Sequence, residues 1–342
     1  MKLQKQIILL LAILLAPMIS LHAQKIFWQK AIGGTGYDNG MRMVPTDHNC
    51  FLLAGTTASN DGLGKGNHSA EKADLVVCRV SAEGQIIWKT LIGGSNTEQF
   101  ADMKPTSDGG VIIMGTTESV DGDAVENHGK MDFILAKVDR FGTLLWSKCF
   151  GGVGNDQGLA VIETSDGGYL IGGESGSRTG TMTHHIGALD SWIAKLDGGG
   201  KVVMEKTFGG RGNERVLNLL ELKKDRYLAV CATNSIDGDV KDPLGEKDVW
   251  LVCFSKNFDI VWQRTYGGSD FDETHQIIRT KSGDLVLCGT SFSDDQDLEG
   301  SPNRGQGDSW MFRVSDQGNL KWSKLYGGAR NEGGNSVAQT PD

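Results

Sequence analysis

The sequence predicts an all-β protein, a β-propeller of four-stranded antiparallel blades. Three observations predict this fold. Gly-Gly pairs recur along the chain about every 58 residues. Each interval holds four short apolar runs separated by turn residues, and no stretch has the periodicity of a helix longer than about one turn. Because one such sheet cannot bury both of its faces, neighbouring copies must stack as blades of one ring.

The second copy shows the expected elements in chain order. Strand A is predicted over 100–106 and strand B over 111–117, joined by a Ser-Asp-Gly-Gly turn at 107–110. A long polar loop at 118–131 leads to strand C over 132–138 and strand D over 144–150. Gly142 supplies the positive φ that the C–D turn needs. Phe258 departs from that glycine in the fourth copy.

All eight tryptophans fall at two positions of the repeat. Five lie on strand D, where Met204 replaces tryptophan in one copy, and three lie on strand C. The strand D set is Trp28, Trp88, Trp146, Trp262 and Trp322, and the strand C set is Trp192, Trp250 and Trp310. Such periodic use predicts packing between blades rather than a single stacking site for a ligand.

The repeat count predicts five complete blades and a split or truncated sixth. An extra D-like strand is expected over 26–32 and an extra A-like strand over 335–340, and together they would join the chain ends. The sequence stops at Pro341-Asp342, where the other copies continue into strand B. A chain truncated at its C-terminus, or a fragment of a larger ring, is therefore one interpretation. Residues 24–342 are predicted to form a single propeller domain.

Residues 1–23 are typical of a secretory signal peptide. Lys2 and Lys5 precede an apolar run at 7–15, and Leu21-His22-Ala23 provides a cleavage site before Gln24. The run is shorter than the roughly 20 residues of a membrane span. We therefore expect an exported protein, in the periplasm, on the outer-membrane surface or outside the cell, with no membrane insertion after cleavage.

Charge and cysteine content limit the partners and the covalent chemistry. The chain has 34 basic and 43 acidic residues, a net charge of −9, which argues against nucleic acid or an anionic membrane as a partner. Its six cysteines lack metal-ligand spacing and mostly fall within predicted strands, so we expect buried thiols. Cys231 and Cys253 lie on neighbouring strands, which leaves one disulfide as an alternative.

The repeat resembles a known group of secreted propellers. Trp146 to Gly173 and Asp190 to Asp197 carry W-x-K, Gly-Gly, T-S-D-G-G-Y-L-I-G-G and D-x-W-x-A-K-L-D. These motifs resemble the β-propeller repeats of Bacteroidetes-type bacteria and are similar to SBBP repeats. Ala136, Gly142 and Trp146 are also similar to the tryptophan-docking motif of quinoprotein-type propellers. The resemblance implies a propeller fold and no established reaction.

The loop between strands D and A carries an acidic residue five positions after each first glycine. The six are Asp38, Glu98, Asp156, Glu214, Asp272 and Glu332. Directed at the axis, they would form a ring of carboxylates that attracts a cation or a cationic partner. A role repeated in every blade also fits a carboxylate that accepts hydrogen bonds within its own loop.

The loop between strands B and C suggests weak calcium candidates. Its paired aspartates are Asp121 with Asp123, Asp237 with Asp239, and Asp295 with Asp297. Calcium prefers several closely spaced oxygen ligands, but no loop completes the twelve-residue calcium pattern. His68, His128 and His184 occupy equivalent positions on separate blades, so we do not expect them to share one zinc ion.

The leading hypothesis is an exported, non-enzymatic scaffold without a required cofactor. It would bind a protein or glycan of the cell envelope through the face with the B–C and D–A loops. One alternative is a polysaccharide hydrolase or lyase, with a site at residues that break the repeat in the third and fourth copies: Arg178, His184, His185, Arg211 and Arg215. Another alternative is a calcium-stabilised structural module. The sequence gives no oligomeric state.

Overall fold

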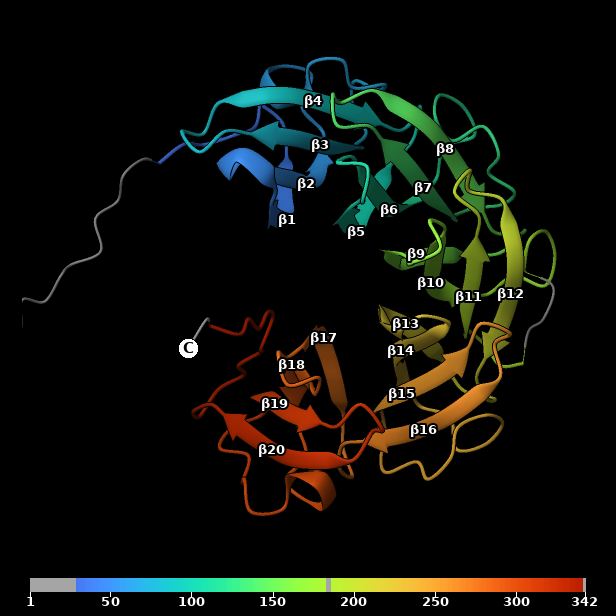
Figure 1. The fold of residues 1–342 in the computed structure, drawn as a ribbon, viewed down its shortest axis with the longest axis vertical. Helices are drawn as coiled ribbons and strands as arrows, with labels where there is room; N and C mark the ends of the chain where they lie inside the picture. The colour runs from blue at the N-terminus through green and yellow to red at the C-terminus, as the bar shows by residue number, and fades with distance from the viewer. Residues whose placement is uncertain (1–28, 183–185, 341–342) are drawn as a thin grey trace, which may run out of the picture. The chain divides into compact units, whose positions relative to one another are not determined.

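The computed structural model describes residues 29–182 and 186–340. The predicted signal peptide, His184 and His185 lie outside these residues. Every described strand belongs to the unit that begins at Ile32. The strands form five four-stranded antiparallel sheets, each in simple chain order, arranged as the blades of a β-propeller (Figure 1). The predicted all-β fold of four-stranded blades is therefore confirmed.

The blades follow one another along the chain. Blade 1 contains β1 (Asp38–Pro45), β2 (Phe51–Thr57), β3 (Asp74–Val80) and β4 (Ile86–Ile92). Blade 2 contains β5 (Glu98–Pro105), β6 (Val111–Thr117), β7 (Asp132–Val138) and β8 (Leu144–Phe150). Blade 3 contains β9 (Asp156–Glu163), β10 (Tyr169–Ser175), β11 (Asp190–Leu196) and β12 (Val202–Phe208).

The last two blades have the same order. Blade 4 contains β13 (Glu214–Lys223), β14 (Arg226–Thr233), β15 (Asp248–Ser255) and β16 (Ile260–Tyr266). Blade 5 contains β17 (Asp272–Arg279), β18 (Leu285–Ser291), β19 (Asp308–Val314) and β20 (Leu320–Tyr326). The helices of the described residues are three single 3₁₀ turns, η1 (Asp47–Asn49), η2 (Gly62–Gly64) and η3 (Gln296–Leu298).

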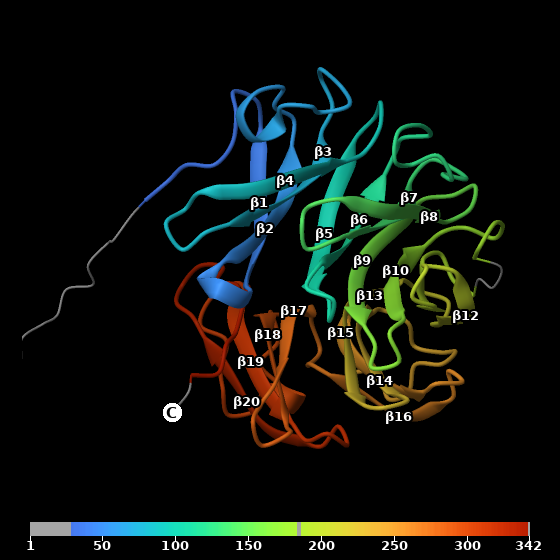
Figure 2. The same ribbon diagram turned by 45° about the horizontal axis from the view of Figure 1, so that its top comes forward.

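The first strand of each blade lies nearest the centre and contacts the next blade (Figures 1 and 2). In blade 2 the predicted bounds of strands B, C and D agree with β6, β7 and β8. Strand A begins at Glu98, two residues before the predicted start at Phe100. The difference arises because the acidic residue at the end of the D–A loop is itself the first residue of the strand.

Apolar side chains from facing sheets form the core between blades. All seven residues of β6 and all seven of β7 are buried, since both faces of these central strands are covered. The six cysteines are buried free thiols. Cys231 pairs in register with Trp250, and Cys253 with Leu228, so the two cysteines do not face each other. The alternative of a Cys231–Cys253 disulfide is wrong.

Three strand D tryptophans, Trp88, Trp146 and Trp262, pack on the C–D turn of the following blade, as the repeat predicts. The indole Nε1 of Trp88 donates to the carbonyl oxygen of Arg140 at 3.0 Å. Its ring covers Gly142, where a Cβ would stand 2.8 Å from the indole. Trp146 covers Gly200 and Trp262 covers Gly318 in the same way. Glycine is needed at these turns for its positive φ and for this close approach.

At the junction of blades 3 and 4, the strand D residue is smaller than tryptophan and the turn residue is larger than glycine. Met204 of β12 holds the tryptophan position, and Phe258 holds the glycine position of the next turn with φ near 60°. Phe258 is buried and packs in one core cluster with Met204. The larger turn residue therefore fills the volume that tryptophan occupies at other junctions.

Residues 332–340 lie along blade 5 where the A strand of a further blade would lie. The N–H of Glu332 donates to Gly307, as Asp272 does to Lys247 one junction earlier. The N–H of Val337 donates to Gln276 at 2.7 Å. The described residues offer this segment no strand B partner, and it does not form the predicted strand 335–340. The other predicted part of a sixth blade, 26–32, lies largely outside the described residues.

Blade 1 shows what the inner strands look like when no blade covers them. Met43 is 62% exposed, whereas Met103 at the same position of β5 is fully buried. Met41 is also exposed. Within the described residues, this face of β1 is therefore uncovered.

No helix of the described residues is long and apolar enough to cross a membrane.

The glycine that contacts the docking tryptophan yields a stability prediction. We expect Gly142→Ala to lower the free energy of unfolding by about 2 to 4 kcal/mol, because alanine adds a strained positive φ and an overlap with Trp88. Gly167→Ala is the matched control, since Gly167 has φ near 80° but nothing within 4 Å of its Cβ position. It should cost about 1 kcal/mol in urea unfolding. Equal losses for the two variants would contradict the docking account.

Candidate functional site

The face that carries the D–A and B–C loops is built on one repeated hydrogen-bonded clamp. Glu98, the first residue of β5, accepts from the N–H of Gly94 at 3.2 Å and from the hydroxyl of Thr117 at 2.6 Å. Asp156 likewise accepts from the N–H of Gly152 at 2.9 Å and from the hydroxyl of Ser177 at 2.6 Å. The carboxylate thus joins the Gly-Gly turn to the end of strand B.

The six acidic side chains that were predicted as a possible ring each lie against the Gly-Gly turn of their own D–A loop. Glu98, Asp156, Glu214 and Asp272 are at most 1% exposed. The six side chains all accept from the second glycine of their own turn; they are Asp38, Glu98, Asp156, Glu214, Asp272 and Glu332. This geometry matches the interpretation in which each acid caps its own loop. A ligand-binding role for these residues stays a prediction.

The paired aspartates of the B–C loop form the second half of the clamp. Asp121 accepts from the N–H of Ser95 at 2.7 Å, and Asp123 accepts from the N–H of Gly93 at 3.1 Å. The other two pairs repeat these contacts: Asp237 with Asp239, and Asp295 with Asp297. The described residues hold no cluster of three or more metal-ligating side chains. Calcium binding here stays a prediction, tested by melting with and without a chelator.

The aspartates that begin strand C fix the end of the same loop. Asp132 accepts from the N–H of His128 at 2.8 Å, and Asp248 from the N–H of Leu244 at 2.7 Å. His68 and His128 each contact the aspartate of their own blade. The two histidines are thus held on separate blades, which agrees with the expectation that they do not share a zinc ion.

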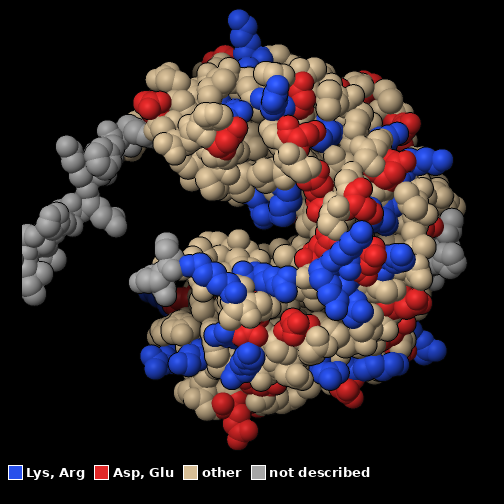
Figure 3. Space-filling model, in the orientation of Figure 1, with Lys and Arg blue, Asp and Glu red and all other residues tan. Residues whose placement is uncertain are grey.

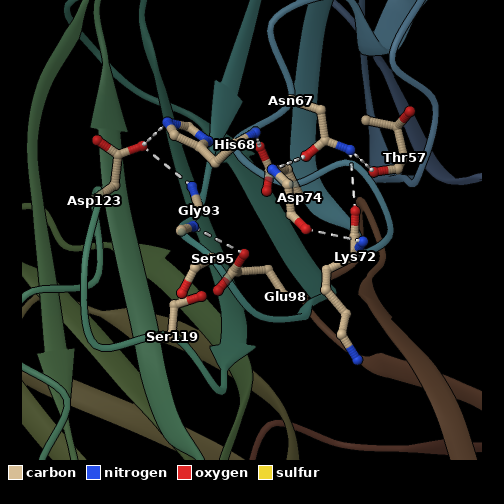
Figure 4. Close-up of polar contacts among 12 residues, drawn as sticks. Thr57, Asn67, His68, Lys72, Asp74, Gly93, Ser95, Glu98, Ser119 and Asp123 are labelled. Carbon is tan, nitrogen blue, oxygen red and sulfur yellow. Dashed lines mark hydrogen bonds and ion pairs between the residues drawn. The ribbon is translucent and has the colours of Figure 1, made fainter.

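The junction of blades 1 and 2 gathers four ionisable groups around Gly93 (Figure 4). His68 Nδ1 lies 2.6 Å from Asp74 Oδ2, and its Nε2 lies 3.8 Å from Asp123 Oδ2. Burial raises the pKa of Asp74, and it raises the pKa of Glu98 to about 7. Burial alone would lower the pKa of His68, but Asp74 outweighs it and the pKa is raised. This cluster can therefore hold and release protons near neutral pH.

Blade 1 shows what neighbouring blades contribute to that shift. Asp38 begins β1 and is only partly buried. Burial opposes its ionisation, yet the hydrogen bonds from Thr57, Gly34 and Ser59 outweigh it and lower its pKa. Asp272, fully covered, has its pKa raised to about 6 by burial. For these two residues, the direction of the pKa shift follows the extent of burial.

The clamp leaves one residue of each loop free to face solvent. In each B–C loop, one exposed residue stands between a serine and the residue whose side chain accepts the backbone N–H of the D–A loop. These five exposed residues are Asn60, Val120, Arg178, Ile236 and Asp294. The five equivalent D–A positions after Gly-Gly are Thr35, Ser95, Val153, Arg211 and Ser269, also exposed. Each D–A residue donates its backbone N–H to the clamp residue of the B–C loop. The two exposed side chains of a blade are therefore held as neighbours.

Blades 3 and 4 combine these positions into one apolar and cationic surface, which we call the tip patch: Val153, Arg178, Ile186, Arg211 and Ile236. The three aliphatic side chains are 66%, 48% and 78% exposed. Gly187 lies against the backbone of Arg211, which joins the B–C loop of blade 3 to the D–A loop of blade 4. Isolated apolar residues are normal on a surface, but a group interleaved with cations is typical of a binding surface.

Two of the sequence-predicted site residues lie on the tip patch, and one does not. Arg178 and Arg211 are both exposed there. Arg215 instead faces Glu174, at 3.8 Å. His184 and His185 lie outside the described residues. Sequence reasoning missed Val153, Ile186 and Ile236. A comparison of the five B–C loops would have revealed Ile236, because the residue after the shared serine differs from blade to blade.

Comparisons with known proteins assign no family to the chain. No protein-family model and no curated protein sequence matches the chain. The chain is similar to the WD40 domain of Neurospora crassa Pan2, with 12% identity and a TM-score of 0.48, over 84% of this chain and 65% of that one. It is also similar to Kuenenia stuttgartiensis hydrazine synthase, with 10% identity and a TM-score of 0.49, over 87% and 68%. The resemblance to secreted Bacteroidetes-type repeats stays a prediction.

The raised pKa of Glu98 yields a pH prediction. Between its ordinary value of 4.5 and about 7, the folded protein keeps a proton that the unfolded chain has lost. The free energy of unfolding should therefore fall as pH rises through this window. We expect Glu98→Gln, which stays neutral, to gain about 1 to 3 kcal/mol over the wild type between pH 5 and pH 8.

Urea unfolding of both proteins across this pH range measures the difference. Asp74 and His68 titrate in both proteins, and because the charge of Glu98 also raises the pKa of His68, the difference reports Glu98 together with this effect on His68. The comparison at pH 5 is an internal control, because the protonated acid and the amide are then alike in charge. Parallel stability curves from pH 5 to pH 8 would show that burial does not hold the proton on Glu98.

Proposed function

We propose that this protein is an exported, non-enzymatic scaffold whose tip patch binds an acidic, partly apolar segment of a cell-envelope protein. The observation that carries the proposal is the alternation of two exposed arginines with three exposed aliphatic side chains on neighbouring loops. Arginine and large apolar residues are enriched in protein interfaces, whereas lysine and acidic residues are depleted.

The charge of the tip patch selects the chemistry of the partner. The chain as a whole carries a net charge of −9, yet the patch is locally cationic. Among the described residues, one carboxylate pairs with its arginines: Asp237 lies 3.4 Å from Arg211, whose side chain remains 89% exposed. An acidic partner would gain favourable pairing at the patch while the rest of the surface repels other acidic proteins.

The hydrogen-bonded loops support binding without a change of shape. The N–H of Val153 donates to Thr179 at 3.2 Å, and that of Arg211 donates to Asp237 at 2.8 Å. The loop serines Ser177 and Ser235 are buried and hold the next N–H groups. A surface that is already ordered loses little conformational entropy on binding.

The patch favours a protein over a glycan as the partner. It contains no aromatic side chain on which a sugar ring could stack. Its three aliphatic residues instead offer the scattered apolar contacts of a protein interface. Arg215 pairs with Glu174 at 3.8 Å and is not part of the tip patch.

The experiment is a pull-down from a cell-envelope fraction with four forms of the purified chain. These are the wild type, the double variant Arg178→Glu with Arg211→Glu, the single variant Ile236→Asp, and the control Phe141→Asp. Phe141 is 68% exposed on the opposite face, so its change to aspartate matches Ile236→Asp in chemistry and exposure. We expect the charge reversal and Ile236→Asp to weaken capture at least about tenfold, and the control to bind as the wild type does.

The measurement has clear outcomes. Capture of one acidic protein by the wild type and the control, and its loss in the two patch variants, supports the proposal. Capture that survives both patch variants would place the partner elsewhere. Retention of polysaccharide instead of protein would replace the protein partner by a glycan, and turnover of that polysaccharide would replace the scaffold by an enzyme.

A further inference from the structure

On the face opposite the tip patch, a repeated ion pair holds the turn between strands A and B. Lys137 of β7 contacts Asp108 of the turn at 2.9 Å, and Lys195 of β11 contacts Asp166 at 3.0 Å. Blades 1 and 5 have the same pair, with Arg79 on Asp47 and Arg313 on Asp284. In four of the five blades a turn carboxylate thus neutralises a strand C cation.

A second carboxylate reaches these turns from the following blade. Glu163 at the end of β9 accepts from the N–H of Ser107 at 2.7 Å, and Glu221 of β13 accepts from the N–H of Ser165 at 2.7 Å. The junction of blades 2 and 3 and the junction of blades 3 and 4 therefore each bring two carboxylates to one turn. With the strand C lysine, the local charge of these groups is negative.

The junction of blades 4 and 5 reverses this charge. Lys224 holds the position of Asp108 and Asp166, and Arg279 holds the position of Glu163 and Glu221. Cys253 replaces the strand C lysine. Lys223 and Arg226 replace the serine and a glycine of the turn. Both carboxylates are thus lost and several cations stand in their place, which Figure 3 shows as lysine and arginine side chains grouped over the β13–β14 turn.

A small cavity opens at the same junction. Its volume is about 70 Å³, and it is lined by Lys223, Arg226 and Arg279, with Asp316 as the single carboxylate. Cys253 and the docking tryptophan Trp262 close its apolar side. The Nε of Arg226 is buried and has no hydrogen-bond acceptor within the described residues, although the guanidinium lies beside the weakly accepting Cys253 thiol. An unsatisfied buried donor of this kind has a free-energy cost that a bound acceptor removes.

We propose that this cavity binds a small oxyanion, with Lys223, Arg226 and Arg279 as its ligands. The anion would take the place of the two carboxylates that the chain itself supplies at the junctions of blades 2 and 3 and of blades 3 and 4. Phosphate, sulfate and a carboxylate share the required chemistry, which is two or more oxygens that accept charge-assisted hydrogen bonds. Arginine suits such a ligand because its planar group presents several N–H donors in a fixed fork.

The geometry around Arg279 prepares the site. One guanidinium nitrogen donates to the carbonyl oxygen of Leu222, the residue before Lys223. This contact holds the guanidinium against the turn and leaves its other donors for a ligand. Asp316 also lines the cavity, and its carboxylate lowers the net positive charge of the lining to one that a single anion can neutralise. The site lies on the face with the A–B and C–D turns, so it is independent of the proposed partner-binding surface.

The test is calorimetric titration of the full chain with inorganic phosphate, sulfate and acetate at constant ionic strength set by chloride. Arg226→Gln removes one ligand, and Arg279→Glu restores the carboxylate found at Glu163 and Glu221. Arg264→Gln is the control, because Arg264 is an exposed arginine of the same blade on β16. We expect each site variant to weaken phosphate binding at least about tenfold, and the control to bind as the wild type does.

The outcomes separate the possible ligands and the proposal itself. Stronger binding of phosphate and sulfate than of acetate assigns a tetrahedral oxyanion, and stronger binding of acetate assigns a carboxylate; either supports the site. Thermal melting checks that the variants fold, and only the wild type and Arg264→Gln should gain stability from the anion. No binding of any of the three anions, or equal binding by all four proteins, overturns the proposal.

Discussion

The structure depends on a carboxylate at the start of each inner strand, which is buried in blades 2 to 5. Its oxygens accept hydrogen bonds from the Gly-Gly turn before the strand and from hydroxyl groups at the end of the neighbouring strand. A buried carboxylate without such partners would be very costly. With them, it fixes where one blade ends and the next begins. The packing of tryptophan on glycine, the pairing of the turns and the positions of the exposed loop residues all follow from that spacing.

The fold could be predicted from the sequence because each blade repeats the same solution. Strands B, C and D of blade 2 were predicted with their observed bounds, since apolar runs and turn glycines mark them directly. The start of strand A was missed because a carboxylate reads as a loop residue until its hydrogen-bond partners are known. The behaviour of residues 335–340 was missed for a related reason: a strand-like sequence needs a neighbouring strand before it can form one.

The site was harder to predict, because most of its polar residues are part of the scaffold. The loop aspartates and the inner carboxylates were candidates from their chemistry alone, and the structure shows their hydrogen bonds within the loops. Arg178 and Arg211 were found because they break the repeat. The aliphatic residues beside them gave no chemical signal in the sequence. The cavity near Arg226 depends on a comparison of blades, since only the equivalent positions reveal the exchanged charges.

The clamp on the loop face separates two requirements that most surfaces must meet together. Folding depends on a glycine pair, a buried serine and backbone N–H groups, and most side chains between them take no part in it, although Asn60 donates to the carbonyl oxygen of Ala70. In the five blades those positions already hold asparagine, valine, arginine, isoleucine and aspartate. The exposed residues of this face can therefore vary from blade to blade while the loop framework stays the same. The recognition properties of the face can diversify by single exchanges that leave the folding free energy almost unchanged, as the variable loops of immunoglobulins do on their constant framework.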